Sequence, residues 1–470
     1  MTKSTQYLGD VCVLGMGGTG IAVCRYLATL MPARVRSVTL YGGARSSAGD
    51  ESRALEAEGV RCVLGTEDVE GDYDLVVASP GISEFSGFFS AAKAHARETI
   101  GEPEFAFRES PEHWVGITGT NGKTTTTTLT AELLRAGGLK AETVGNIGTI
   151  VTGELASRDE ATWFVAELSS FHLATTRLLH PRVACLLNIT PDHVEWHGSL
   201  EAYAAAKERL FANLDAGDLA VVSVDDDWCR AVADRLDARG LRVCRLSVQE
   251  APDAPCAAFR RDGSLVVRID GAETVVASED ELPIKGEHNV ENALAASTMA
   301  LELGVSADDV HRGLLAFQAL EHRIEPCGEI DGVHFVNDSK ATNTDSVEKA
   351  LTAFATGTID LLLGGHDKAT DLSSLATAVA ACCRVAVCYG EAGERIARAL
   401  EDAVVTSGSS LVVVRAPHMT EAFEAACAHA LPGDTVLLSP ACSSFDEFSN
   451  MAERGRLFKR LVSERAGGAV

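Results

Sequence analysis

Gly116-Ile-Thr-Gly-Thr-Asn-Gly-Lys-Thr-Thr125 is the stretch that decides the fold of the central part of this chain. It follows the β-favouring residues 113–115 and leads into a threonine-rich segment that can continue as a helix. Glycines let a backbone pass close to a polyanion, and the free N–H groups and dipole at a helix start hold phosphate. Lys123 would supply a positive charge to the phosphates, and the Thr124 hydroxyl would bind Mg²⁺. The stretch therefore predicts a nucleotide phosphate loop.

This loop differs from the strict phosphate-loop motif, which has four residues between its glycines. Only two residues separate Gly119 from Gly122. A glycine–threonine turn with an incidental lysine is the alternative. The coincidence of strand, turn, Gly-Lys-Thr and helix favours a variant phosphate loop.

Composition and charge narrow the class of protein. The chain has 470 residues, 46% of them hydrophobic, which is enough for two to four domains. A net charge of −26 argues against nucleic acid or an anionic membrane as partner. The sequence has neither a signal-peptide pattern nor an apolar run of spanning length, so we expect a cytoplasmic protein. The 13 scattered cysteines, without a CxxC pair, predict buried thiols in place of disulfides or zinc ligands.

Residues 8–110 are predicted to form a small α/β domain. A buried strand, residues 11–15, leads into Gly15-Met-Gly-Gly-Thr-Gly20 and an amphipathic helix over 21–30. This GxGxxG pattern in a strand-to-helix setting predicts a bound phosphate, with a purely structural turn as the alternative. A nicotinamide enzyme would place an acid at the end of the second strand, but Ser37–Tyr41 ends without one. A third strand, Leu75–Ala78, ends at a second candidate ligand turn, Ser79–Ser83.

The central region carries polar residues at the ends of two further predicted strands, 163–167 and 183–188. In an open parallel sheet, ligands bind beyond the carboxyl ends of the strands. Thr124, Glu167 and His193 could therefore meet at one edge, where a hydroxyl, a carboxylate and an imidazole would suit Mg²⁺. Each of them alone would more often be structural.

Three side chains on predicted helices are candidates that also have an ordinary structural explanation. Lys207, in the helix-favouring segment 203–211, is a solvated lysine by default. Asn289 and Asn292 are three residues apart, hence on one helix face, and paired amides suit a purine edge. Helix capping by Asn289 is the competing interpretation.

Residues 323–470 are predicted to form a third α/β unit with strands near 333–336, 361–363, 385–389, 411–414 and 435–439. Polar clusters follow three of these strands, at 337–343, 364–368 and 439–446. Their lysines and hydroxyls could hold a substrate carboxylate. Ordinary capped turns are the alternative.

Together these motifs resemble the Mur ligases over essentially the whole chain. The motifs that carry the resemblance are Gly116–Thr124, Glu167–Phe171, Asn188–His193, Gly286–Asn292, His322-Arg323, Asn337–Asn343, Leu363–Lys368 and Leu438–Asp446. The first five place the chain in the superfamily. The last three are similar to the branch of the family that adds D-glutamate.

The resemblance implies an α/β fold with three domains. A Rossmann-like domain over 1–110 would bind a UDP-sugar, and a P-loop-type ATPase domain with a mainly parallel sheet over 111–322 would bind ATP. A Rossmann-like domain over 323–470 would bind the amino acid and close over both. The implied reaction adds D-glutamate to UDP-N-acetylmuramoyl-L-alanine (UDP-MurNAc-L-Ala) through an acyl phosphate. The enzyme would be a cytoplasmic monomer that makes a peptidoglycan precursor.

The resemblance also implies roles for matching residues. Lys123, His193, Lys207 and Lys340 would be catalytic, and Thr124, Glu167, His193 and a carbamylated Lys207 would hold two Mg²⁺ ions. The ATP contacts would be Gly119, Thr120, Asn121, Gly122, Lys123, Thr124, Thr125, Asn289, Asn292, Arg323 and Asp338. The substrate contacts would be Gly18, Thr19, Gly81, Asn146, Thr342, Lys368, Ser444 and Phe445.

Other functions remain open from the sequence. Another Mur ligase should differ at Lys368 and Ser444-Phe445, and a folylpolyglutamate synthetase typically lacks a separate UDP-binding domain like residues 8–110. A nicotinamide oxidoreductase would explain Gly15–Gly20 but not Gly116–Thr125. A non-enzymatic nucleotide switch would explain the phosphate loop but not the remaining clusters.

Overall fold

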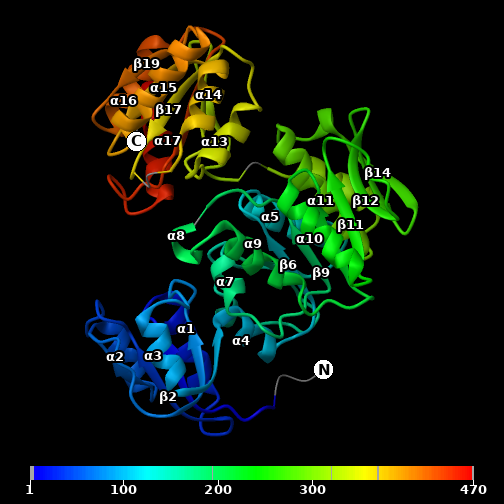
Figure 1. Ribbon diagram of the computed structural model, residues 1–470, viewed down its shortest axis with the longest axis vertical. Helices are drawn as coiled ribbons and strands as arrows, with labels where there is room; N and C mark the ends of the chain where they lie inside the picture. The colour runs from blue at the N-terminus through cyan, green and yellow to red at the C-terminus, as the bar shows by residue number, and fades with distance from the viewer. Residues whose placement is uncertain (1–4, 193, 319, 368–369, 468–470) are drawn as a thin grey trace. The chain divides into compact units, whose positions relative to one another are not determined.

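The chain builds three β-sheets, one after another along the sequence (Figure 1). The computed structural model describes residues 5–192, 194–318, 320–367 and 370–467. The chain divides into two units, residues 1–282 with 290–316 and residues 283–289 with 317–470. The first two sheets belong to the first unit and the third sheet to the second. The domain boundaries near 110 and 322 stay predictions.

The first sheet has five parallel strands in the order β3-β2-β1-β4-β5. Side chains alternate between its faces: Val11 and Val13 pack with α1, α2 and α4, whereas Cys12 and Leu14 pack with α3. Figure 1 labels α1, α2 and α3 in the blue part of the chain and α4 where the colour turns to cyan. The strands are β1 (Gly9–Leu14), β2 (Val35–Tyr41), β3 (Arg61–Val63), β4 (Tyr73–Ala78) and β5 (Ala96–Gly101). The helices are α1 (Gly18–Thr29), α2 (Asp50–Ala57), α3 (Gly87–Ala94) and α4 (Glu102–Glu109).

The second sheet has nine strands in the order β14-β13-β12-β11-β10-β9-β6-β8-β7. It is parallel from β7 to β12, and β12, β13 and β14 form an antiparallel extension. Its strands are β6 (Trp114–Thr118), β7 (Ala141–Gly145), β8 (Trp163–Glu167), β9 (Val183–Leu186), β10 (Leu219–Ser223), β11 (Arg242–Ser247), β12 (Cys256–Arg261), β13 (Ser264–Ile269) and β14 (Ala272–Ser278). The helices are α5 (Lys123–Ala136), α6 (Val151–Glu154), α7 (Ser170–Ala174), α8 (Val194–His197), α9 (Leu200–Glu208), α10 (Asp227–Ala238), α11 (Glu287–Glu302) and α12 (Ala307–Ala316).

The third sheet has six strands in the order β15-β16-β20-β17-β18-β19, all parallel except β15. Leu361 and Leu363 face α13, α14 and α15, and Leu362 faces α16 and α17. The strands are β15 (Glu325–Ile330), β16 (Val333–Asn337), β17 (Ile359–Gly364), β18 (Cys383–Tyr389), β19 (Val412–Arg415) and β20 (Thr435–Ala441). The helices are α13 (Thr344–Leu351), α14 (Ser373–Cys382), α15 (Gly393–Ser407), α16 (Met419–His429) and α17 (Met451–Arg465).

This architecture confirms the predicted α/β class with mainly parallel sheets. Every strand that the sequence predicted is present, with ends shifted by one or two residues. The predicted helix over 203–211 begins earlier, at Leu200, and its last three residues form a 3₁₀ turn. The sequence analysis did not identify β3, β5, β7, β10, β11, the antiparallel β12–β14 or β15. Most of these strands lie at or near sheet edges, where exposed polar residues interrupt the apolar runs, but β10 and β11 are interior parallel strands that it overlooked.

All 13 cysteines are free thiols in the structure; nine of them are buried as predicted, whereas Cys62, Cys327, Cys382 and Cys427 are partly exposed. Burial raises the pKa of several of them, such as Cys12, to about 12. Among the described helices, none has both the length and the apolarity to span a bilayer.

Candidate active site

The phosphate loop between β6 and α5 is braced by the segment that follows β9. The Thr120 N–H donates to the Asn188 carbonyl at 2.9 Å, and the Asn121 N–H donates to the Asn188 side-chain oxygen at 2.8 Å. Thr118 pairs with Leu186 in the sheet, so both segments leave the sheet at its carboxyl edge. The backbone of the loop is therefore held in place by the segment that follows β9.

Gly122 ends the loop in a conformation that only glycine adopts easily. Its φ is +82°, and an added Cβ would lie 2.5 Å from the Asn292 side-chain oxygen. The next residue, Lys123, begins α5, so the unbonded N–H groups of the helix start directly behind the loop. Asn292 is buried there and accepts a hydrogen bond from the Thr126 hydroxyl at 3.0 Å. This places Asn292 next to the loop; its contact with adenine stays a prediction.

Two lysines converge on one carbonyl of the loop. The ammonium groups of Lys123 and Lys207 donate to the Gly119 carbonyl at 2.8 and 2.7 Å. Lys123 also donates to the Thr120 carbonyl at 2.8 Å. The two lysine side chains thus come together at the predicted phosphate position although they are 84 positions apart in the sequence.

Lys207 is not the solvated lysine that its helix pattern allows. Its side chain is 1% exposed, and its ammonium lies over the Tyr203 ring, 4.5 Å from the centroid. Burial, followed by the nearby Lys123, lowers the pKa of Lys207 well below its usual value. The carboxylates of Asp192 and Glu167 act in the opposite direction, so acidic groups lie close to it. A buried lysine beside a second lysine and two acidic groups is a candidate functional residue.

Glu167 ends β8 beside the loop. Its side chain is 1% exposed, and one carboxylate oxygen accepts a hydrogen bond from the Asn146 amide at 2.7 Å. Its other oxygen is buried and has no hydrogen-bond partner among the described residues. A buried carboxylate oxygen without a partner is costly unless a cation or another donor satisfies it.

These residues fit a divalent cation. Mg²⁺ prefers oxygen ligands, and Glu167 offers an unsatisfied carboxylate oxygen at the same sheet edge as Thr124, the second residue of α5. Thr125, next in the helix, has a buried hydroxyl with no partner in the described structure. His193, predicted as a further ligand, lies outside the described residues.

The glycine loop after β1 is built by close backbone packing. Gly15 has a φ of +100°, and a Cβ on Gly20 would lie 1.9 Å from the Gly15 carbonyl oxygen. The predicted substrate residues Gly18 and Thr19 open α1. The loop is compatible with the predicted phosphate contact because the helix N-terminus points its N–H groups toward it.

Ser79 is a residue of this site that the sequence analysis did not single out. It follows β4, within the turn that contains the predicted residue Gly81, and it lies beside Gly15, whose added Cβ would be 3.0 Å from its hydroxyl. The Ser79 hydroxyl is buried and lacks a partner among the described residues. The available signal was its position as the first polar residue after a parallel strand.

In the second unit, Asp338 lies buried directly after β16. Its carboxylate accepts hydrogen bonds from the Ser439 hydroxyl at 2.8 Å and from the Ile324 N–H at 3.3 Å. Burial raises the pKa of Asp338 to about 7, and the charge of Arg323 partly offsets this rise. The structure therefore brings the predicted residues Arg323 and Asp338 together.

Arg454 joins two of the polar clusters of the second unit. It is fully buried, and its guanidinium donates to the Ser339 carbonyl at 2.9 Å and to the Cys442 carbonyl at 3.1 Å. Lys340 and Thr342 lie in the first cluster, where the Lys340 N–H donates to the His322 carbonyl. No local signal marks Arg454, since an arginine on the helix α17 would normally be solvated.

The end of β17 meets the segment after β20. The His366 N–H donates to the Ser443 carbonyl at 2.9 Å, which sets the 364–367 loop beside Ser444 and Phe445. Ser444 is buried, whereas the Phe445 ring is 69% exposed. Lys368 lies outside the described residues.

In the same unit the Asn289 amide donates to the Lys285 carbonyl, a local bond at the start of α11.

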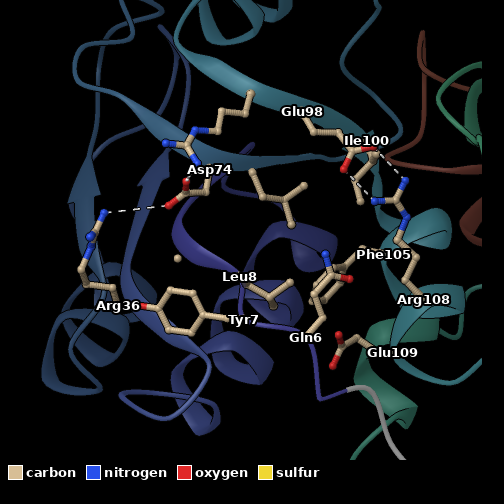
Figure 2. Close-up of a pocket in the computed structure, with 13 residues that line it drawn as sticks. Gln6, Tyr7, Leu8, Arg36, Asp74, Glu98, Ile100, Phe105, Arg108 and Glu109 are labelled. Atoms are coloured by element: carbon tan, nitrogen blue, oxygen red, sulfur yellow. Dashed lines mark hydrogen bonds and ion pairs between the residues drawn. The ribbon is translucent and has the colours of Figure 1, made fainter.

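A separate cavity of about 470 Å³ lies at the amino edge of the first sheet, shown in Figure 2. Leu8, Ile100 and Phe105 contribute apolar surface to it. Its charged groups form ion pairs within the protein, such as Arg97 with Asp74 at 3.0 Å. The cavity is at the opposite edge from the Gly15 and Ser79 turns, so it is not part of the predicted site.

Comparisons with known proteins agree with the geometry. The family model described as Mur ligase middle domain matches residues 117–300, and the model described as Mur ligase, glutamate ligase domain matches residues 322–442. Two relatives, from Koribacter versatilis and Alkaliphilus metalliredigens, are 36% and 38% identical to this chain and bear the name UDP-N-acetylmuramoylalanine–D-glutamate ligase. The first alignment covers 97% of both proteins, and the second covers 96% of this chain and 97% of the relative.

Solved structures are similar in fold. A pseudomurein peptide ligase type C from Methanothermus fervidus has a TM-score of 0.59 at 16% identity, over 97% of this chain and 99% of that one. The UDP-N-acetylmuramate-alanine ligase MurC from Thermotoga maritima has a TM-score of 0.56 at 18% identity, with the same coverage. The resemblance noted in the sequence is thereby confirmed: this chain belongs to the Mur ligase family.

Proposed function

We propose that this chain is an ATP-dependent ligase that joins D-glutamate to UDP-MurNAc-L-Ala, a step in the synthesis of peptidoglycan precursors in the cytoplasm. The structural observation that carries the proposal is the convergence of Lys123 and Lys207 on the Gly119 carbonyl near Glu167. The shared name of relatives that match the full chain supports the choice of substrates.

The first chemical step transfers the γ-phosphoryl group of ATP to the alanyl carboxylate. The bond to the β-phosphate oxygen breaks, a bond to the carboxylate oxygen forms, and ADP leaves. Lys123 neutralises negative charge on the phosphates, and the N–H groups at the start of α5 bind them. When bound, Mg²⁺ ions supply further charge neutralisation. Thr124 and Glu167 would hold them, with His193 and Lys207 as the remaining proposed ligands.

The second step forms the amide. The neutral amine of D-glutamate attacks the acyl phosphate, the tetrahedral intermediate collapses, and inorganic phosphate leaves. No protein nucleophile is required, so catalysis depends on position and charge. Lys340 would stabilise the phosphoryl group when the third domain closes over the site.

The remaining residue assignments form part of the proposal. The adenine side would use Asn289, Asn292, Arg323 and Asp338, the UDP-sugar would bind Gly18, Thr19, Gly81 and Asn146, and D-glutamate would bind Thr342, Lys368, Ser444 and Phe445. The proposed domains are residues 1–110, 111–322 and 323–470. We further propose that the enzyme acts as a monomer on these small molecules.

Lys207 is proposed to carry a carbamate. Burial lowers the pKa of its amine, which favours the form that reacts with CO₂, releasing one proton and becoming an anion beside the cation site. Lys207→Ala should therefore lose activity, and short carboxylates added to the variant should partly restore it. Lys140→Ala, which removes an exposed lysine that pairs with Asp159, is the control. Full activity of Lys207→Ala would rule out the carbamate.

The reaction is tested by phosphate release from ATP with UDP-MurNAc-L-Ala and four amino acids: D-glutamate, L-lysine, meso-diaminopimelate and L-alanine. We expect turnover only with D-glutamate. Turnover only with another amino acid would identify a different Mur ligase. Turnover with a folate and glutamate in place of the nucleotide-sugar would identify a folylpolyglutamate synthetase.

A further inference from the structure

Two buried carboxylates at the start of α4 hold the backbone of neighbouring segments. One oxygen of Glu102 accepts hydrogen bonds from the Thr152 N–H at 2.6 Å and from the Thr152 hydroxyl at 2.7 Å. Glu104 accepts hydrogen bonds from three successive N–H groups, those of residues 177–179. Thr152 lies in α6, which follows β7, and residues 177–179 come after α7, which follows β8. Helix α4 therefore supports the segments that follow two neighbouring strands of the second sheet.

The segment that Glu102 holds runs between the cation site and the first glycine loop. We call residues 145–152 the bridge segment. Near its start, the Asn146 N–H donates to the Glu167 carbonyl at 2.8 Å, and the Asn146 side chain donates to the Glu167 carboxylate. Near its end, the Ile150 side chain lies against the start of α1, where a Cβ added to Gly18 would be 3.3 Å from Ile150 Cδ1. The bridge segment thus contacts both places.

Stability alone does not explain a carboxylate at position 102. Burial raises the pKa of Glu102, and the two hydrogen bonds from Thr152 act in the opposite direction. Because desolvation of a carboxylate offsets most of what such bonds contribute, the net stabilisation is small. Both bonds end on one oxygen, so they fix the position and direction of the Thr152 backbone. An apolar side chain would fill the same space without fixing the bridge segment.

We propose that Glu102 is a positioning residue, which holds the bridge segment so that the first glycine loop and the cation site keep their geometry together. Asn146, at one end, orients the Glu167 carboxylate, and Ile150, near the other, lies against the helix start at Gly18. The inference rests on the proposed function for the identity of the two ligands, the nucleotide-sugar and Mg²⁺. Since one segment contacts both places, a displacement of about 1 Å should weaken the use of both ligands at once.

The test uses variants that separate the position of the oxygen from its charge. Glu102→Ala removes the acceptor, whereas Glu102→Gln keeps a side-chain oxygen that can accept both hydrogen bonds. Thr152→Val removes only the hydroxyl bond, so the test does not depend on Glu102→Ala being folded. The control is Glu109→Ala, which removes another buried carboxylate of α4; Glu109 bonds to Tyr26 and Arg34 and makes no printed contact with the bridge segment.

Two measurements are made on each variant. Hydrogen exchange, followed by mass spectrometry of peptides over 145–155, reports on the bridge segment without any substrate. Steady-state phosphate release gives the KM for UDP-MurNAc-L-Ala, the KM for D-glutamate and the Mg²⁺ concentration for half-maximal activity. Thermal melts show how much of any change follows from lost stability.

We expect Glu102→Ala to raise the exchange rate of the bridge segment, the KM for UDP-MurNAc-L-Ala and the Mg²⁺ requirement about 10-fold each. The KM for D-glutamate should stay within about 2-fold. Thr152→Val should shift the same three quantities about 3- to 5-fold, because one of two hydrogen bonds remains. Glu102→Gln should stay within about 2-fold of the wild type. Glu109→Ala should lower the melting temperature but leave both constants unchanged.

Three results would overturn the role of Glu102 while leaving the proposed function intact. Unchanged constants in Glu102→Ala, with or without faster exchange, would make it a structural residue only. An equal shift in Glu109→Ala would mean that lost stability is the cause. A Glu102→Gln variant as impaired as Glu102→Ala would mean that the charge matters and the position of the oxygen does not. If the wild type releases no phosphate with these substrates, the proposed function fails, and hydrogen exchange still decides whether Glu102 holds the bridge segment.

Discussion

The two glycine loops of the first unit have the same strand–turn–helix arrangement but different surroundings. Both follow a parallel strand, β1 or β6, and both lead into a helix, α1 or α5. The first is shaped by backbone contact, with Gly20 against the Gly15 carbonyl and a single unsatisfied hydroxyl at Ser79. The second is braced by side chains and holds Lys123 and Lys207 beside it.

Under the proposed function, the first loop would only bind a phosphate group, whereas the second would also take part in phosphoryl transfer. Backbone N–H groups around a glycine loop bind a phosphate without changing it. Lysines and a carboxylate oxygen that lacks a partner create strong local charge in a dry site, which stabilises charge that develops during phosphoryl transfer. In a chain of net charge −26, the Lys123 ammonium and the N–H groups at the start of α5 are what would attract a nucleotide triphosphate locally.

The largest effect should come from the second loop. Lys123→Met should lower kcat/KM about 10³-fold, because it removes the cation at the phosphate position. Steady-state phosphate release measures it, and a urea melt checks that the fold is retained. Lys140→Met, at an exposed lysine, should change nothing. A Lys123 variant with near-normal activity would remove the distinction between the two loops.

Substitutions in the first loop should change the free energy of unfolding of the protein. A methyl group on Gly20 meets the Gly15 carbonyl oxygen at 1.9 Å, so Gly20→Ala should destabilise the protein by about 3 kcal/mol or more. A methyl group on Gly17 meets nothing within 4 Å, so Gly17→Ala should cost less than about 1 kcal/mol. Chemical denaturation compares the pair. Equal stability of the two variants would show that backbone packing does not shape this loop.

The dependence of activity on Mg²⁺ tests whether Glu167, beside the second loop, is a cation ligand. Glu167→Gln replaces the buried carboxylate oxygen that lacks a partner, so the Mg²⁺ concentration for half-maximal activity should rise about 10- to 100-fold. Glu142→Gln, at an exposed position on β7, is the control. Magnesium titrations of phosphate release with both variants provide the measurement, and overlapping curves would exclude Glu167 as a ligand.

The smallest effect should come from the bracing of the second loop. Tyr203→Phe removes the hydrogen bond to Thr120 and should cost about 1 kcal/mol of unfolding free energy. Tyr389 offers a matched control, since its buried hydroxyl has no partner in the described structure. Tyr389→Phe should be neutral or slightly stabilising by the same melts. A larger loss for Tyr389→Phe than for Tyr203→Phe would contradict this interpretation of the loop.

Much of the site was predictable because it is local. Strand, glycine turn and helix start lie within ten residues at Gly116–Thr125, and short continuous apolar runs located the neighbouring parallel strands β8 and β9. Since parallel strands end at one edge of a sheet, the strand pattern alone predicts that Glu167 lies near the phosphate loop. The antiparallel strands β12–β14 were not predicted, because the apolar runs of β12 and β13 are short and contain arginines.

The sequence by itself determined the α/β class, the two strand–glycine turn–helix loops and the kinds of residue at the strand ends. Only the tertiary structure decided that Lys207 is buried against Tyr203 and that Arg454 bridges two clusters. It also decided that one oxygen each of Ser79 and Glu167 finds no partner among the described residues. The physical reason is the range of the interactions. Backbone conformation follows from neighbours along the chain, whereas burial, ionisation and hydrogen bonding depend on groups that folding brings from far away.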